Sequence, residues 1–269
     1  CYAYIAYQTA YLKANYPAEY MASVMTHNLN NTKQITLFME DCMNMGVDVL
    51  GPDVNESDYV FSVNEKGQVR FGLGAIKGIG EGPSEAIVST RKEERYKNIF
   101  DFFERIPSSQ INKRVVESLV FAGAFDELDT YHRAQYFDVD NSGKATVERL
   151  LRYGQSFQDS KNHVENSLFA DFADEIQIER PKILLSPEWP NMHKLNKEKE
   201  IIGFYLSAHP LDEFKYQYQF VQGVLSRKEV LDQKTDDQAL IEKSAALEEK
   251  EPSTVDDIDI DDDKDVVDL

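Results

Sequence analysis

The sequence is poor in the residues that build cross-links and metal sites. Its 269 residues include only two cysteines, Cys1 and Cys42, too few for a disulfide framework or a cysteine-based zinc site. Isolated thiols fit a reducing compartment, so we expect a cytoplasmic protein. The five histidines lack the short spacings of metal-ligand sets, which argues against a metal site. They are His27, His132, His163, His193 and His209.

Long apolar runs and net positive charge are also missing. No stretch approaches the roughly 18 apolar residues of a membrane span, and we recognise no signal peptide, so we expect no membrane partner. The net charge of -19 argues at first against a nucleic-acid partner. Its distribution changes this: from Arg227 onward 16 acidic and 6 basic residues give -10, whereas Arg70 to Arg114 holds 9 basic and 6 acidic, giving +3. Local charge matters most when a partner touches one face.

The sequence does contain a glycine-rich segment, FGLGAIKGIGEGPSEAI, over residues 71–87. Pro83 suits the first turn of a helix. A tight turn leading into a helix presents backbone N–H groups and a positive dipole end, which favour an anion such as phosphate. The segment has four glycines, which suit a sharp turn or a close approach to a partner: Gly74, Gly78, Gly80 and Gly82.

The spacing of these glycines fails the Gly-x-Gly-x-x-Gly pattern of dinucleotide sites, and the Gly-Lys-Ser/Thr of a phosphate-binding loop is absent. A purely structural turn is almost as well supported locally as phosphate capture. The apolar-Lys-Gly-apolar-Gly core, with Ala86 and Ile87 behind it, resembles a helix-hairpin-helix motif, whose hairpin grips the DNA backbone without reading sequence. This interpretation assigns DNA contacts to Lys77, Gly78, Ile79, Gly80, Gly82, Lys113 and Arg114. They lie in a basic island that also includes Arg70, Arg91, Lys92, Arg95 and Lys97.

The remaining pattern predicts a mainly α-helical fold with a small β-hairpin: a helical bundle, a helix-hairpin-helix region and a disordered acidic tail. Helical spacing predicts helices over about 2–12, 17–25 and 32–42, and we expect their tyrosines and methionines in the core. A hairpin is predicted over 59–63 and 68–71, a short strand over 47–50, and helices over 83–95, 99–106, 111–122 and 194–205. We interpret the helix pair around Pro107-Ser108-Ser109 as a degenerate second helix-hairpin-helix unit.

Four segments carry a resemblance to a known family: YAYIAYQTAYLKANYPAEYMASVMT, DVLGPDVNESDYVFSVNEKGQVRFGLGAIKGIGEGPSEAI, KRVVESLVFAGAFDEL and NKEKEIIGFYLSAHPLDEF. In this order, over roughly 1–220, they closely resemble the alpha subunit of bacterial DNA polymerase III, in the C family of replicative polymerases. The resemblance implies a fragment of a longer chain. Its regions would be the end of the fingers domain (1–58), the hairpin and DNA-binding region (59–126), a clamp-binding segment and linker (127–226) and the acidic tail (227–269).

The resemblance also says what to expect of activity and partners. In this family palm aspartates hold two Mg²⁺ ions, and the palm would lie upstream of Cys1. We therefore expect no catalytic residue, metal or cofactor in this chain, which alone would be inactive, although its parent would be a DNA-directed DNA polymerase. The stretch matching the family's clamp-binding peptide is Glu165-Asn166-Ser167-Leu168-Phe169, with Leu168 and Phe169 as apolar anchors and Glu165 replacing a glutamine. Expected partners are duplex DNA, the sliding clamp and other replicative polymerase subunits.

Two alternative functions stay open. A stand-alone helix-hairpin-helix repair enzyme would need an aspartate after the hairpin, for which Asp101 is the one nearby candidate. A protein-interaction module would use the glycine segment only as a turn. The stretch Asp138-x-Asp140-x-Ser142-Gly143 resembles the opening of a calcium loop, but Arg149 stands where the bidentate glutamate belongs, so we interpret it as a polar turn.

Overall fold

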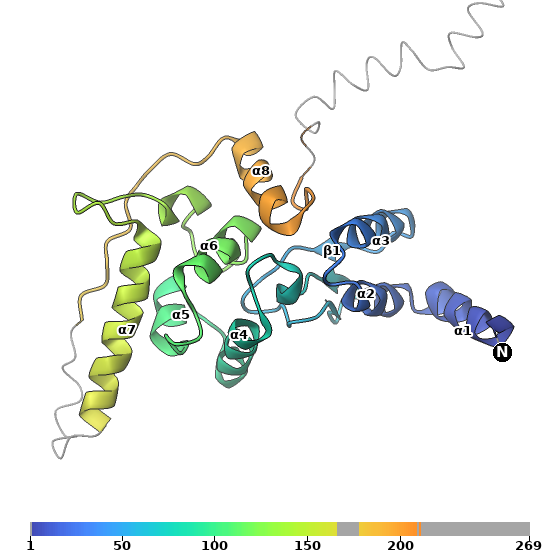
Figure 1. Ribbon diagram of the computed structural model, residues 1–269, viewed down its shortest axis with the longest axis horizontal. Coiled ribbons are helices and arrows are strands. Elements are labelled where there is room, and N and C mark those ends of the chain that lie inside the picture. The colour runs from blue at the N-terminus through green and yellow to red at the C-terminus, as the bar shows by residue number, and fades with distance from the viewer. Residues whose placement is uncertain (1, 166–177, 209, 211–269) are drawn as a thin grey trace, which may run out of the picture. The chain divides into compact units, whose positions relative to one another are not determined.

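The computed structural model describes residues 2–165, 178–208 and 210, all within one compact unit, Cys1–Pro210. The second unit, Leu211–Leu269, and with it the predicted acidic tail, lies outside the described residues. The described unit is mainly helical with one small sheet, as predicted (Figure 1). None of its helices is both long and apolar enough to cross a membrane.

The first three helices are α1 (Tyr2–Asn15), α2 (Pro17–His27) and α3 (Thr32–Asn44). Helix α2 buries Met21 and Met25 and packs against α3 and the sheet. Helix α3 begins after Asn31, whose side chain accepts a hydrogen bond from the backbone of Gln34, 3.3 Å away. The expectation that methionines form the core is therefore confirmed for α2.

The same expectation is wrong for the tyrosines of α1. This helix has no buried residue, and Tyr2 is 90% and Tyr7 69% exposed. Its apolar and aromatic side chains are spread around the helix rather than gathered on one side, so no single face can pack on the rest of the described unit. Lys13 is tied to α3 by an ion pair with Asp41, at 2.8 Å.

The sheet has the order β1-β3-β2, built from β1 (Val49–Leu50), β2 (Ser62–Val63) and β3 (Val69–Arg70). Strands β2 and β3 form the predicted antiparallel hairpin, with Val63 opposite Val69. The sequence did not indicate that β1 would pair with β3 in parallel, with Val49 beside Val69. A two-residue strand carries no alternation of its own, so only tertiary contacts choose its partner.

The next elements are a short 3₁₀ turn, η1 (Leu73–Ala75), then α4 (Glu81–Glu93), α5 (Ile99–Arg105) and α6 (Lys113–Ala122). They confirm the predicted helices to within two residues at most ends. Their apolar faces meet in a core with Ile87, Phe102 and Leu119 fully buried. Helix α6 ends at Gly123, whose φ of +85° suits the left-handed C-terminal position.

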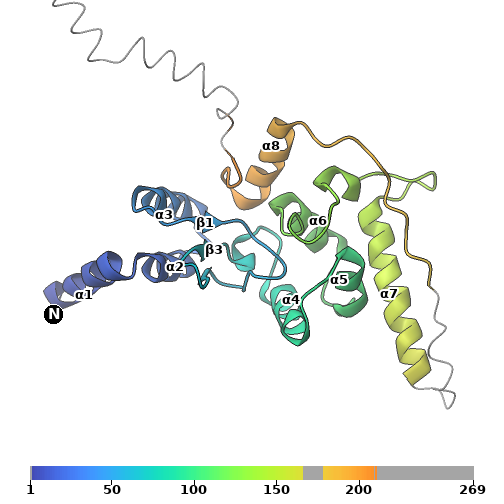
Figure 2. The same ribbon diagram turned by 180° about the vertical axis from the view of Figure 1, so that it is seen from behind.

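The last described elements are η2 (Arg133–Tyr136), α7 (Thr146–Glu165) and α8 (Asn191–Ile202). Helix α7 continues through the polar stretch after Phe157, where no helix was predicted. Helix α7 packs on α5 and α8 on α6, as both views show (Figures 1 and 2). Residues predicted as a clamp-binding segment and linker thus include two helices that join the helix-hairpin-helix region.

Candidate nucleic-acid interface

The glycine segment forms a tight turn against α6. Gly78 has a φ of +90°, a conformation that L side chains rarely adopt. A Cβ atom on Gly78 would lie 3.1 Å from Ser118 Oγ and 3.4 Å from Arg114 Nε. The turn is closed by a hydrogen bond from Ile79 N to Ile76 O, at 3.2 Å. Glycine is therefore required here both for the backbone angle and for the close packing on α6.

The turn leads directly into the exposed N-terminus of α4. Gly80 is the N-cap residue and provides no side-chain cap, and the first hydrogen bond of the helix runs from Ser84 N to Gly80 O at 3.3 Å. Within the described part of the chain, no acceptor pairs with the N–H groups of Gly80, Glu81 or Gly82. A Cβ on Gly80 would have no atom within 4 Å. These donors, at the positive end of the helix dipole, can bind an anion.

A second helix N-terminus lies beside the first. Asn112 caps α6, its side chain accepting a hydrogen bond from Val115 N at 3.0 Å. The turn before it reaches the glycine segment, because a Cβ on Gly82 would lie 3.2 Å from Gln110 Oε1. The turn between α5 and α6 (107–112, the second hairpin) thus sits next to the glycine turn (76–82, the first hairpin). The helix pair predicted as a second unit takes this place.

Four members of the basic island pair with acidic side chains of the folded chain, which offset part of its positive charge. Arg70 is buried and pairs with Glu56. Arg91 donates to Asp58 at 2.6 Å and to backbone carbonyl groups. The other two also face acidic partners in the folded chain: Arg95 with Glu56 at 3.4 Å and Lys97 with Glu94 at 2.8 Å.

The three cations predicted to bind DNA lie at the two hairpins but differ in whether they already have a partner within the protein. Lys77 Nζ donates to Glu200 O at 3.0 Å, which ties the turn to the end of α8. Lys113 pairs with Glu148 at 2.6 Å, and this hydrogen bond holds the pKa of Glu148 below its usual value. Arg114 is exposed and has no acidic partner among the described residues. It is therefore the cation most available to a phosphate.

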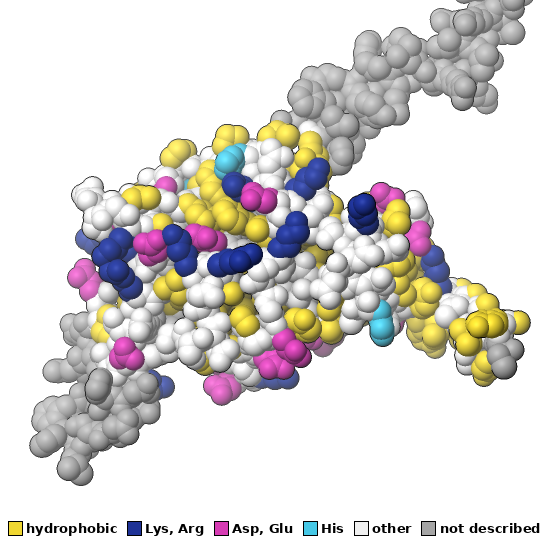
Figure 3. Space-filling model, viewed as in Figure 1, with side chains coloured by type: hydrophobic (Ala, Val, Ile, Leu, Met, Phe, Trp, Pro, Cys, Tyr) yellow, Lys and Arg dark blue, Asp and Glu magenta, His cyan; other side chains and the backbone are white. Residues whose placement is uncertain are grey.

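The charge distribution on this face agrees with that geometry. Figure 3 shows Lys and Arg side chains in a row across the part of the face where α6, α8 and the glycine turn lie. Acidic side chains are interspersed with them, so the row is mixed rather than purely basic. Backbone N–H groups, not side-chain charge alone, must then supply much of any anion binding.

Other candidate residues have structural partners. The carboxylate of Asp101 accepts hydrogen bonds from Lys97 N at 3.0 Å and from Arg105 at 3.3 Å. In the calcium-like loop, Asp140 accepts from Ser142 N at 2.8 Å, and Arg149 Nε lies 3.7 Å from its other oxygen. Arg149 thus brings a side-chain cation to this aspartate. No cluster of three metal-ligating side chains occurs in the part of the chain that the structure describes.

The predicted clamp-binding stretch falls almost wholly outside the described residues. Glu165 is the last residue of α7, whereas Leu168 and Phe169 belong to the segment 166–177 that is not described.

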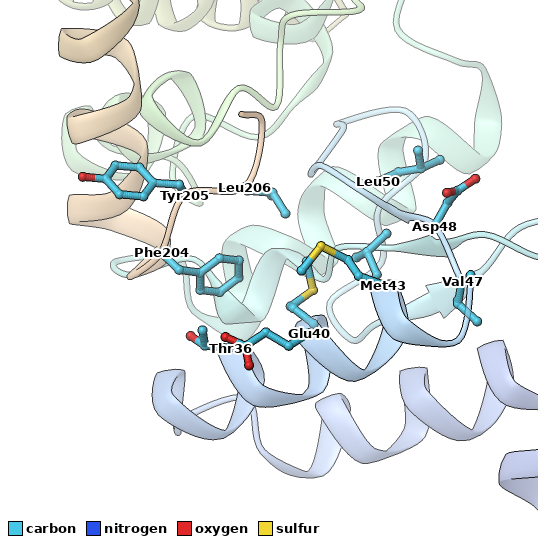
Figure 4. A pocket seen from close by; sticks show the side chains of 12 residues that line it. Thr36, Glu40, Met43, Val47, Asp48, Leu50, Phe204, Tyr205 and Leu206 are labelled. Atoms are coloured by element: carbon cyan, nitrogen blue, oxygen red, sulfur yellow. The ribbon is translucent and has the colours of Figure 1, made fainter. Parts of the chain in front are cut away.

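A pocket of about 630 Å³ lies between α3, β1 and the segment after α8 (Figure 4). Its walls are largely apolar, with Met43 on one side and Phe204 and Leu206 on the other. The sequence did not reveal it, since its walls are far apart along the chain. The described residues that line it include no grouping of acid, base and nucleophile typical of catalysis.

One wall of this pocket is fixed by a buried ion pair. Glu198 accepts hydrogen bonds from Leu206 N at 2.6 Å and Ser207 N at 2.7 Å, and it faces Arg133 at 3.3 Å. Burial opposes the charge on Arg133, but Asp126 and Glu198 outweigh it, so the pKa of Arg133 is raised. The segment after α8 is thereby tied to α8 and η2.

Comparison with known proteins agrees with this geometry. The helix-hairpin-helix motif family matches residues 46–136, which contain both hairpins. The DNA polymerase III subunit alpha of Vibrio cholerae serotype O1 is 40% identical over 216 residues, which are 79% of this chain and 18% of that protein. Those of Escherichia coli K12 and Neisseria meningitidis serogroup A are 37% and 38% identical, covering 83% and 79% of this chain but 19% and 18% of the relatives. The chain spans less than a fifth of the length of these relatives.

Proposed function

We propose that this chain, which is homologous to a segment of DNA polymerase III subunit alpha, holds duplex DNA for a replicative polymerase by binding the phosphate backbone. The observation that carries the proposal is the meeting of two helix N-termini at the hairpins. There Gly80, Glu81 and Gly82 leave backbone N–H groups unpaired within the described chain, and Arg114 lies beside Gly78.

Such a surface fits a regularly spaced chain of phosphates. Backbone N–H groups at a helix N-terminus favour an anion but cannot distinguish bases, so the contacts fix position without reading sequence. Arg114 adds one exposed cation, and Lys77 and Lys113 lie close to the same hairpins. A net charge of -19 is compatible with this, because only this face would approach the DNA.

The remaining parts of the proposal concern the polymerase as a whole. The parent activity would be template-directed DNA synthesis in the cytoplasm, with Mg²⁺ and catalytic aspartates supplied outside this chain. Glu165, Leu168 and Phe169 would bind the sliding clamp, the two apolar side chains filling a pocket on its surface. Such a tether raises the effective concentration of the polymerase at the primer end.

Duplex binding is tested by a salt titration. Fluorescence anisotropy with two labelled duplexes of unrelated sequence, between 50 and 200 mM salt, should give the same affinity for both and a steep linear fall of log K with log[salt]. Binding that ignores salt, or that strongly prefers one duplex, would overturn the proposal. Absence of any binding would favour a protein-interaction module instead.

Clamp binding is tested separately. We expect immobilised clamp to retain the wild-type chain and to lose a variant with both Leu168→Ala and Phe169→Ala. The matched control is Phe172→Ala, which removes an aromatic side chain three residues after Phe169. Equal retention of the double variant and the wild type would reject the assigned residues.

A further inference from the structure

A side chain from a distant helix braces the second hairpin. Gln158 of α7 donates from Nε2 to Phe103 O at 3.1 Å and to Ile106 O at 2.6 Å. Its Oε1 accepts from Ser108 N at 3.0 Å. The two carbonyl groups lie at the C-terminal end of α5, where the helix leaves carbonyl groups without partners. One amide side chain therefore forms hydrogen bonds with three backbone groups at the start of the turn.

Helix α7 is held close to α5 at the same place by independent contacts. A Cβ on Gly154 would lie 2.5 Å from Phe103 O, so only glycine allows this approach of the two helices. The hydroxyl of Tyr153 donates to Glu104. Because Gly154 and Gln158 are four residues apart on a helix, they share the face that α7 turns toward α5.

Besides this brace, the second hairpin is held by the buried side chain of Ile111 and by the Asn112 cap of α6. It contains no glycine, and its local backbone hydrogen bond runs from Gln110 N to Pro107 O at 2.9 Å. Residues 107–110 are exposed, yet Gln110 must stay beside Gly82 for the two hairpins to share a surface. The brace from α7 acts on the turn just before this contact.

We propose that Gln158 is a positioning residue for nucleic-acid binding. It holds the second hairpin so that the N-termini of α4 and α6 face one duplex backbone together. This inference rests on the proposed function, since Gln158 itself is not placed against DNA. It assigns to α7, which follows the helix-hairpin-helix match along the sequence, a share in shaping the interface.

The test uses the full chain with Gln158→Met, which keeps the length of the side chain and removes all three hydrogen bonds. The control is Gln155→Met, an exposed glutamine on the same helix. We expect amide hydrogen exchange at Ser108 to accelerate by about tenfold and duplex affinity to fall by about three- to tenfold, the range of one or two hydrogen bonds. The control should change neither.

Unchanged exchange at Ser108 would overturn the brace. Faster exchange with unchanged duplex affinity would overturn the positioning role while leaving the proposed function standing. If the wild-type chain fails to bind duplex, the proposed function is rejected. The exchange rate of Ser108 would then still show whether Gln158 holds the second hairpin. If Gln158→Met does not fold, Gln158→Glu replaces it, with Gln155→Glu as the control for the added charge. Glutamate keeps the acceptor for Ser108 N but loses the donor to the two carbonyl groups. We therefore expect Ser108 to stay protected from exchange and duplex affinity to fall below that of the control.

Discussion

The two hairpins place helix N-termini at one surface but obtain their shapes in different ways. The first hairpin is shaped from within: Gly78 supplies the left-handed backbone angle and the close approach to α6. The second hairpin has no glycine and is shaped from outside, by Gln158 of α7 and by the Asn112 cap. The shape of the first hairpin thus depends on a short stretch of its own sequence, whereas that of the second depends on a helix some fifty residues away.

The two hairpins are therefore sensitive to different substitutions. A hairpin built on glycine fails when its own residues change, since a strained φ cannot be relieved by neighbours. A braced hairpin fails when the brace is removed, although its own sequence is intact. Changing one hairpin at a time should therefore separate effects on stability from effects on binding.

The largest effect is expected from Gly78→Ala. Alanine at a φ of +90° is strained, and its methyl group would press on Ser118 Oγ at 3.1 Å. We expect the free energy of unfolding to fall by about 1–3 kcal/mol, measured by urea denaturation. Duplex binding should weaken as well, because the turn that aims the α4 N-terminus is displaced.

Gly80→Ala is the matched control, since this residue has no atom within 4 Å of a new Cβ and no positive φ. It should lower the unfolding free energy by less than Gly78→Ala does, because it costs only the preference of the N-cap position for glycine over alanine. If Gly78→Ala proves as harmless as Gly80→Ala, the first hairpin does not depend on its glycine angle and the contrast between the hairpins disappears.

The next effect concerns the cap of the second hairpin. Asn112→Ala removes the acceptor for Val115 N at the start of α6 and should lower the free energy of unfolding by about 1 kcal/mol. Asn98→Ala, which removes the corresponding cap of α5, is the comparison. A larger loss of duplex affinity for Asn112→Ala than for Asn98→Ala is expected, because α6 begins at the proposed interface and α5 does not.

The first hairpin and its helix could be predicted from sequence because glycine and proline act locally. The same holds for the β2–β3 hairpin and for α5 and α6, whose caps and apolar spacing lie within each segment. The brace at Gln158 could not be predicted, since a glutamine in a polar stretch looks like any solvated residue. Nor does the charge pattern of the sequence show that Arg70 and Arg91 pair with Glu56 and Asp58.

A smaller change, confined to binding, is expected from Arg114→Gln. Arg114 has no acidic partner among the described residues, so stability should stay within about 0.5 kcal/mol of wild type. The slope of log K against log[salt] should fall by about 1, the value for one phosphate contact. Lys92→Gln is the control, an exposed cation on α4 away from its N-terminus. An equal change in slope for both variants would mean that net charge, not position, sets the affinity.

The smallest effect is expected at the exposed pair of Lys113 and Glu148. Their hydrogen bond lowers the pKa of Glu148 from its ordinary 4.5 and raises that of Lys113 from 10.5. The pair therefore stabilises the fold between these two values, and its contribution is lost as pH falls through the lowered pKa or rises through the raised one. The urea midpoints of wild type and Glu148→Gln should differ slightly at pH 7 and converge near pH 2.

The same variant decides what Lys113 does at the second hairpin. If Lys113 turns to a phosphate when DNA binds, it must leave Glu148, which lies 2.6 Å away. Removing that carboxylate leaves Glu117, 3.8 Å from the lysine, as its remaining acidic partner and takes one negative charge from the surface, so Glu148→Gln should bind duplex more tightly than wild type at low salt. Unchanged or weaker affinity would show that Lys113 serves only to join α6 to α7. In that case Arg114 would be the one described cation at the start of α6 that contacts the DNA phosphate backbone.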